Sequence, residues 1–292
     1  MLAVSKDAFR VVYDAVVRDW KPRVDGKLFE ECIGVAAKNK ILLHFLRVLD
    51  TRSDVRVCEE ARYKEFLGNL RIVAETLEGL NHVFIKLRKP VVYMPSDVDV
   101  LVARNHVVKA VARLRARGFR IEVVEPYCVT MVRGDCVADL YIYPTMGGMI
   151  YLDSKELFEH IEHSLFDGLE IPVLKTYAEA LMTIAHAVYK ERIYTLNDYV
   201  TVKKWFSKKT LKLAEKLCCL EAVNEALAIH KLVEERGIVL PYRIPFAEWI
   251  DILRSKITCD KLSRATILNV LNTLRDRRLG KLVISKLTRE TY

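Results

Sequence analysis

Asp97 and Asp99 open an otherwise apolar run, Pro-Ser-Asp-Val-Asp-Val-Leu-Val, at residues 95–102. Side chains alternate between the two faces of a strand, so both aspartates would lie on one face while the valines face the core. Two neighbouring carboxylates repel each other unless a cation lies between them, and Mg2+ prefers oxygen ligands. The pair therefore predicts a metal site, although two solvated acids at the start of a strand would give the same pattern.

A third aspartate, Asp139, lies in the middle of a second strand-like run, Asp-Cys-Val-Ala-Asp-Leu-Tyr-Ile-Tyr, at residues 135–143. An ionised carboxylate inside an apolar strand is unfavourable unless it is paired or bound to a metal ion. Between the two runs we predict a helix over 107–117 and a strand over 120–124. A strand that carries Asp139 beside the first pair would complete a site of three carboxylates.

This arrangement, with Asp-x-Asp on one strand and a third acid on a later strand, resembles the nucleotidyltransferase superfamily built on the DNA polymerase β-like palm. The similarity is greatest to its little-characterised prokaryotic and archaeal families. Three later stretches are similar to the helices that follow the palm there: Leu-Lys-Thr-Tyr-Ala-Glu-Ala-Leu (174–181), Ala-His-Ala-Val-Tyr-Lys-Glu-Arg (185–192) and Leu-Asn-Asp-Tyr (196–199). The resemblance covers roughly residues 65–206.

The resemblance implies an α+β fold, with a small mixed β-sheet palm flanked by N-terminal helices and a C-terminal helical domain. It also implies metal-dependent transfer of a nucleoside monophosphate from a nucleoside triphosphate to an acceptor hydroxyl of RNA, protein or a small molecule. Asp97 and Asp99 would hold the Mg2+ or Mn2+ that orients the triphosphate. Asp139 would complete a second metal site and favour deprotonation of the attacking hydroxyl.

The nucleotide contacts that the resemblance implies include one departure from the family. A glycine-containing turn usually precedes the acidic pair there, but this chain has Lys-Leu-Arg-Lys-Pro at 86–90. Without glycine the backbone approaches phosphates less closely, although Lys86, Arg88 and Lys89 could supply phosphate-binding charge. Ser96 beside the acidic pair and Lys190 are further candidate nucleotide contacts, and Asp198 is a candidate orienting partner. Solvated basic residues at a strand end would equally explain the 86–90 run.

The missing glycine leaves an alternative function open: a catalytically degenerate protein of the same fold that binds nucleic acid or a protein partner. Residues 207–292 hold 17 Lys and Arg against 10 Asp and Glu, which is +7 of the chain's net charge of +9. Basic surface attracts RNA or DNA by releasing counterions. We therefore predict one continuous positive surface from Lys203, Lys204, Lys208, Lys209, Arg275, Arg277 and Arg278. A solvated basic face would explain the same charges.

Composition restricts the remaining possibilities. The 292 residues are 51% hydrophobic and 29% charged, which is typical of a globular protein with a sizeable core. We find neither an apolar stretch long enough for a membrane span nor a secretory signal at the N-terminus, and so expect a cytoplasmic protein. Glutamine is absent while Lys, Arg and Glu are plentiful, a composition that fits a thermophile.

Apolar residues at three-to-four spacing predict N-terminal helices over Lys6–Trp20, Leu28–Leu49 and Ala61–Leu80, followed by a strand over His82–Leu87. Gly147 and Gly148 predict a turn after the third acid. From Thr176 onward the pattern is again helical. We therefore divide the chain into an N-terminal helical region (1–80), a palm (81–170) and a C-terminal helical domain (171–292).

Overall fold

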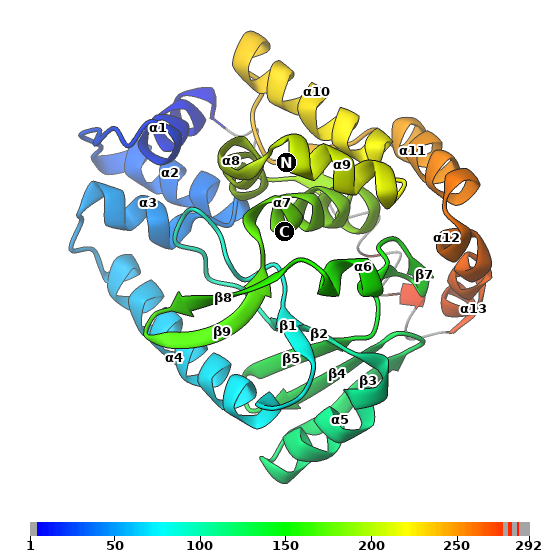
Figure 1. The fold of residues 1–292 in the computed structure, drawn as a ribbon. Coiled ribbons are helices and arrows are strands. Elements are labelled where there is room, and N and C mark those ends of the chain that lie inside the picture. The colour runs from blue at the N-terminus through cyan, green and yellow to red at the C-terminus, as the bar shows by residue number, and fades with distance from the viewer. Residues whose placement is uncertain (1–4, 277–279, 282–284, 286–292) are drawn as a thin grey trace.

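The computed structural model describes residues 5–276, 280–281 and 285, and has the predicted α+β class with a central mixed sheet (Figure 1). The strands of this sheet are β1 (His82–Phe84), β2 (Val98–Val102), β3 (Arg120–Glu125), β4 (Cys128–Arg133), β5 (Cys136–Tyr141), β8 (Ile161–Phe166) and β9 (Leu169–Leu174). They are ordered β3-β4-β5-β2-β1-β9-β8. β2 runs parallel to β5 and β1 parallel to β9, whereas the other neighbours are antiparallel.

Along the sequence, helices come before, between and after the strands of this sheet. The N-terminal helices are α1 (Lys6–Val17), α2 (Gly26–Lys38), α3 (Leu42–Leu49) and α4 (Asp54–Leu77), and the short η1 (Arg104–His106) and α5 (Val107–Ala116) follow β2. The later helices are α6 (Ser154–Phe158), α7 (Thr176–Ala185), the π-helical η2 (His186–Glu191), α8 (Leu196–Trp205), α9 (Lys208–Lys216), α10 (Leu220–Arg236), α11 (Phe246–Cys259), α12 (Lys261–Thr266) and α13 (Leu268–Arg275). No helix in the described ranges is both long and apolar enough to cross a bilayer.

The two faces of β2 have different partners, as its alternating sequence predicts. Val98, Val100 and Val102 pack in one core with α4 and α5. Leu101 belongs to a second core that includes apolar residues of α1, α2, α7, α8 and α10. Because Asp99 alternates with the valines, its carboxylate lies on the side of this second core, between the sheet and the helices.

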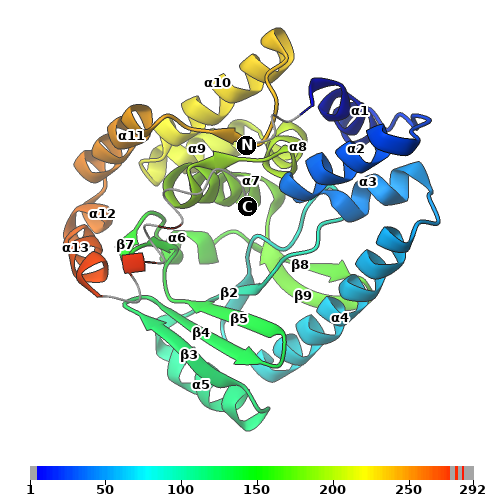
Figure 2. The ribbon, with the colours of Figure 1, turned by 180° about the vertical axis from the view of Figure 1, so that it is seen from behind.

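The second core joins segments that are far apart in the sequence. At the end of α2 the Asn39 side chain donates to the carbonyls of Val35 and Leu240 and accepts from the backbone of Leu196. These bonds hold the N-terminal helices beside the C-terminal ones, and the two groups lie side by side in both ribbon views (Figures 1 and 2). The helix predicted over Leu28–Leu49 is therefore interrupted, with left-handed Lys40 at the break.

The sheet has strands that the sequence did not predict, namely β4, β8 and β9, and it extends beyond the boundary drawn at residue 170. The strand β4 was not predicted; it pairs antiparallel with both β3 and β5 and supplies Thr130 opposite Asp139. The sheet also extends to Leu174, so the boundary drawn at residue 170 falls inside β9. Gly147 and Gly148 do form the predicted turn, between the short strands β6 (Thr145–Met146) and β7 (Met149–Ile150). A second small hairpin pairs β10 (Ile193–Tyr194) with β11 (Tyr242–Arg243).

Candidate active site

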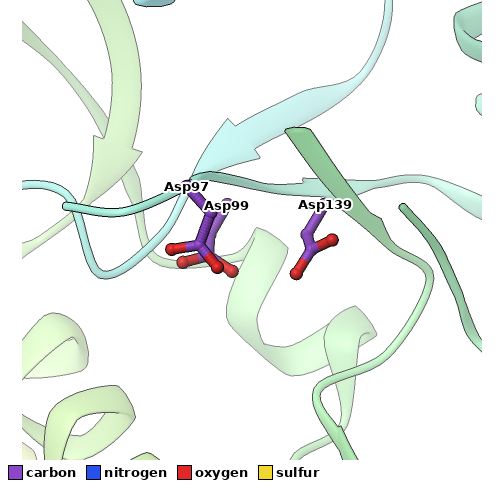
Figure 3. A group of neighbouring side chains, drawn as sticks. All are labelled: Asp97, Asp99 and Asp139. Carbon is purple, nitrogen blue, oxygen red and sulfur yellow. The ribbon is translucent and has the colours of Figure 1, made fainter. Parts of the chain in front are cut away.

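The parallel pairing of β2 with β5 brings the three aspartates together. Asp99 is the register partner of Asp139 across this pair, and Asp97 immediately precedes β2. One carboxylate oxygen from each aspartate lies within 4.8 Å of the others, and the three side chains point to the same side of the sheet (Figure 3). The predicted convergence is thereby confirmed. Three carboxylates at this spacing fit a hard divalent cation such as Mg2+ or Mn2+, since such ions take oxygen ligands.

A lysine is built into this acidic cluster. The Lys86 ammonium lies 2.7 Å from Asp99 Oδ1, and both side chains are largely buried. Burial, reinforced by the charge of Asp97, raises the pKa of Asp99 to about 7. Burial would also raise the pKa of Asp97, but the positive charges of Lys86 and Lys190 outweigh it and hold that pKa below its ordinary value. The two neighbouring aspartates therefore have different proton affinities.

Hydrogen bonds from neighbouring side chains orient Asp139. Thr130 donates to Asp139 Oδ1 at 2.6 Å, and the Tyr141 hydroxyl donates to Asp139 Oδ2 at 3.2 Å. Lys190 in turn donates to the Tyr141 hydroxyl at 3.0 Å. The chain from Lys190 through Tyr141 links the helical side of the cavity to the third acid on the sheet.

The segment after β1 bends through a left-handed residue that is not a glycine. Lys86 has φ +60°, a left-handed conformation that residues with a Cβ adopt uncommonly. The Ile85 backbone donates to the Asp99 carbonyl at 3.1 Å, and the Lys86 backbone donates to the carboxylate of buried Glu179 at 3.2 Å. Lys89 pairs with the same carboxylate at 3.3 Å and donates to Thr183 at 2.7 Å. The sequence could not indicate this conformation, because contacts to β2 and α7 fix it.

A cavity of about 230 Å³ opens above the three acids. Four of the residues predicted as nucleotide contacts line it, namely Lys86, Ser96, Lys190 and Asp198. Lys89, a third basic residue of the 86–90 run that could bind phosphate, also lines it. Further lining residues were not predicted from the sequence: Lys40, Tyr93, Tyr141, Thr183, His186, Glu191 and Asn197. A larger cavity of about 710 Å³ lies elsewhere, between the C-terminal end of α4 and the strands β8 and β9, and none of the three acids lines it.

The fifth predicted nucleotide contact, Arg88, is placed elsewhere, and that prediction needs correction. Its guanidinium pairs with Glu162 on the edge strand β8 and lies over the Trp205 ring. Arg88 is not among the residues that line the 230 Å³ cavity. A carboxylate and an aromatic face on its own side of the segment hold it there, whereas Lys86 and Lys89 face the cavity.

Lys190 and Asp198 reach the cavity from different local structures. Lys190 lies in the π-helical turn η2, a wider helix geometry that is frequent at functional sites. Asp198 lies in the first turn of α8, where its carboxylate accepts from the backbone and hydroxyl of Thr195 in a capping box. Asp198 therefore has a structural role in starting α8 as well as a place on the cavity wall.

The basic residues predicted to form one surface are distributed over several elements. Lys203 pairs with Glu234 at 2.5 Å, and Lys209 lies over the Tyr177 ring. α8 and α9 pack against α7, whereas α13, which carries Arg275, packs against β7. Arg277 and Arg278 lie outside the described residues. A continuous positive surface thus stays a prediction.

No family model matches the sequence, and no curated protein matches it. Among solved structures, the solution structure of the antibiotic-resistance factor ANT(2'')-Ia matches with a TM-score of 0.34 and 11% identity, over 60% of this chain and 94% of that chain. The crystal structure of ANT(2'')-Ia in complex with adenylyl-2''-tobramycin matches with a TM-score of 0.33 and 11% identity, over 58% and 97%. JHP933 from Helicobacter pylori matches with a TM-score of 0.33 and 12% identity, over 76% and 97%.

Proposed function

We propose that this protein is a nucleotidyltransferase that transfers a nucleoside monophosphate from a nucleoside triphosphate to an acceptor hydroxyl. One observation carries the proposal: carboxylates from two adjacent parallel strands converge within 4.8 Å in a cavity that lysines also line. Carboxylates hold divalent cations and ammonium groups bind phosphates, so the cavity combines the two groups that phosphoryl chemistry uses.

Asp97, Asp99 and Asp139 are the residues that would hold Mg2+ or Mn2+. A bound divalent ion would neutralise charge on the phosphates and lower the pKa of the attacking hydroxyl. Thr130 and Tyr141 keep the Asp139 carboxylate turned toward the cavity through their hydrogen bonds. Such support orients a ligand group before the ion arrives.

The lysines on the cavity wall supply the phosphate contacts. Lys190 lies where its ammonium can reach both the Tyr141 hydroxyl and a phosphate oxygen, and Lys40 enters the cavity from the break between α2 and α3. The cavity volume of about 230 Å³ is below the roughly 300 Å³ at which pockets for drug-sized ligands begin. We therefore place the phosphates inside it, with the sugar and base toward its mouth.

In the reaction that this arrangement supports, the acceptor oxygen bonds to the α-phosphorus while the bond from that phosphorus to the pyrophosphate oxygen breaks. The hydroxyl proton passes to the Asp139 carboxylate, and pyrophosphate leaves with the electron pair. Catalysis comes from positioning the reactants and from stabilising the charge that develops on the phosphoryl oxygens. Lys190, on the cavity wall, would stabilise that charge.

The conformation of Lys86 helps to decide between an enzyme and the alternative function, a catalytically degenerate binding protein, which the missing glycine had left open. The φ of Lys86, +60°, is a conformation that glycine adopts readily, so the lysine does not prevent a tight bend after β1. This bend beside the converged carboxylates supports an enzyme over a degenerate binding protein.

The test is label transfer from each α-labelled nucleoside triphosphate, with Mg2+ or Mn2+, to RNA, DNA, protein or small-molecule acceptors. We expect the wild-type protein to label one acceptor class, and Asp97→Asn and Asp99→Asn to reduce labelling by at least about 100-fold while the fold is kept. Asp135→Asn is the matched control, because Asp135 is exposed in the turn before β5 and outside the cavity. A wild-type protein that neither binds a nucleoside triphosphate with Mg2+ nor labels any acceptor would contradict the proposal.

A further inference from the structure

Lys86 places an ammonium group inside the cluster of three carboxylates. Its ammonium is 2.7 Å from Asp99 Oδ1, and its side chain is 15% exposed. It also lies 5.3 Å from the centre of the Tyr141 ring, whose face attracts cations. The second lysine on that ring, Lys190, donates a hydrogen bond to the Tyr141 hydroxyl at 3.0 Å.

The backbone holds this ammonium in place. Lys86 has its left-handed conformation because its N–H is bonded to Glu179 while the preceding residue, Ile85, is bonded to the Asp99 carbonyl. Strained backbone of this kind persists where surrounding structure fixes it, and it is common at functional sites. An ammonium tethered in this way is always present at the cluster, whereas a metal ion must be recruited from solution.

The charges of the cluster then limit how many ions it takes. Carboxylates that bind a cation are deprotonated, so the ion-bound cluster carries three negative charges, which Lys86 together with one divalent cation balances. A second divalent cation would leave two surplus positive charges in a largely buried site. Unbalanced charge in such surroundings is strongly unfavourable.

We propose that Lys86 is a built-in cation that takes the place of one of the two divalent ions, so that the protein binds a single divalent ion at its three aspartates. This inference rests on the proposed function, because it concerns the same acidic cluster. It assigns Lys86 a positioning role: the ammonium holds Asp99 Oδ1 at 2.7 Å within the cluster that binds the ion.

The experiment counts bound Mn2+ on the full chain by equilibrium dialysis, with electron paramagnetic resonance of the free ion as a second measurement. We expect one Mn2+ per wild-type chain. Lys86→Met removes the ammonium and should either add a second Mn2+ or tighten the first by about tenfold, the scale on which one adjacent charge changes a carboxylate's affinity for a cation. Lys86→Gly removes the same charge and accepts a positive φ without strain, so it tests the inference even if the methionine variant does not fold.

Arg88→Met is the matched control, because it removes a positive charge two residues away that pairs with Glu162 outside the cavity. Its Mn2+ binding should equal that of the wild type. Two Mn2+ per wild-type chain, or identical binding by the wild type and both Lys86 variants, would overturn the inference while label transfer still stood. No Mn2+ binding by any variant would overturn both this inference and the metal-dependent function proposed above.

Discussion

Thr130 is the residue that fixes the third aspartate without contacting the other two. Its hydroxyl donates to Asp139 Oδ1 at 2.6 Å, and the remaining oxygen of that carboxylate has a longer bond from Tyr141. A carboxylate held at both oxygens presents its lone pairs in one direction. The orientation that Figure 3 shows for Asp139 therefore depends on a residue of β4.

Replacing Thr130 with valine should lower Mn2+ affinity and label transfer by about 10- to 100-fold, the usual effect of removing a partner that orients a metal ligand. Valine keeps the branched shape that suits a strand, so we expect the fold to be kept. Thr130→Ser retains the hydroxyl and should stay close to the wild type. Equal Mn2+ affinities for the valine and serine variants would show that the hydrogen bond does not orient Asp139.

His230 makes stability depend on pH at a place remote from the acids. Its ring stacks on Tyr199 with centroids 4.2 Å apart, and its Nε2 is 3.0 Å from the buried Tyr194 hydroxyl. Burial, with a smaller effect from Lys203, lowers the pKa of His230 from 6.5 to about 4. The unfolded chain therefore binds a proton between these values that the folded chain does not, and stability is lost as pH falls from about 6.5 to 4.

His230→Gln should remove this part of the pH dependence. The depressed pKa corresponds to a loss of about 3 kcal/mol in the free energy of unfolding of the wild type between pH 6.5 and 4. Glutamine cannot take up that proton, so urea unfolding at both pH values should show a smaller loss for the variant. Glu234 and Lys203 are present in both proteins, so the difference between the two profiles reports the His230 ring and its effect on the pKa of Glu234. Parallel pH profiles would mean that His230 is not kept neutral in the folded protein.

At the scale of elements, alternation and turn chemistry predicted the parts that depend on local sequence. The aspartates of β2 share a face opposite Val98 and Val100, and the two glycines do turn the chain after β5. Two other features depend on tertiary contacts and could not be predicted. The left-handed Lys86 is fixed by Glu179, and Lys40 reaches the cavity because the N-terminal helix breaks at Asn39.

The strand β4 is a different case, because its sequence contains residues that favour a strand and yet the strand was not predicted. The run Cys-Val-Thr-Met-Val-Arg at 128–133 contains residues that favour strands, but its buried residues, Cys128 and Met131, are three positions apart and belong to the two different cores. A strand that is covered on both faces lacks the alternation with a period of two residues by which a half-buried strand is recognised. Arg88 was wrongly predicted for a similar reason. It is basic and close in sequence to the acidic pair, but its guanidinium pairs with Glu162, a partner that the sequence does not reveal.

The hairpin between β6 and β7 permits a test at the element scale. Gly148 has φ +84°, and a Cβ there would lie 2.9 Å from Asn269 Cβ and 3.3 Å from Pro126 Cγ. Gly148→Ala should therefore lower the free energy of unfolding by about 1–3 kcal/mol, from backbone strain together with overpacking against α13. Urea unfolding measures this directly.

Gly34 is the matched control for that substitution. It lies inside α2, and a Cβ there would meet no described atom within 4 Å. Gly34→Ala should raise stability by about 0.5–1 kcal/mol, because alanine is the better helix former. If Gly148→Ala proved as harmless as Gly34→Ala, the contact of the hairpin with α13 would not be tight.

At the scale of the whole molecule, the acidic cluster adjoins the second core, which joins both groups of helices to the sheet. Apolar residues of the N-terminal helices, of the sheet and of the C-terminal helices pack together on the face of the sheet that carries the acids. Asn39 adds hydrogen bonds between the two helical groups. A ligand that binds the folded cluster should therefore stabilise the described fold as one unit, so we expect a single unfolding transition that shifts with the ligand.

Mn2+ at about 100 times its dissociation constant should add about 2.7 kcal/mol to the free energy of unfolding, because it binds the folded cluster and not the unfolded chain. For a chain of this size the melting temperature should rise by about 5 °C, measured by far-UV circular dichroism and by tryptophan fluorescence. Asp139→Asn should abolish the shift, since it removes one of the three converging carboxylates, whereas Asp135→Asn, an exposed acid near the start of the same strand, should retain it. Equal shifts for the two variants would place the ion away from the aspartate cluster, and two separate transitions would show that the sheet and the helices do not unfold together.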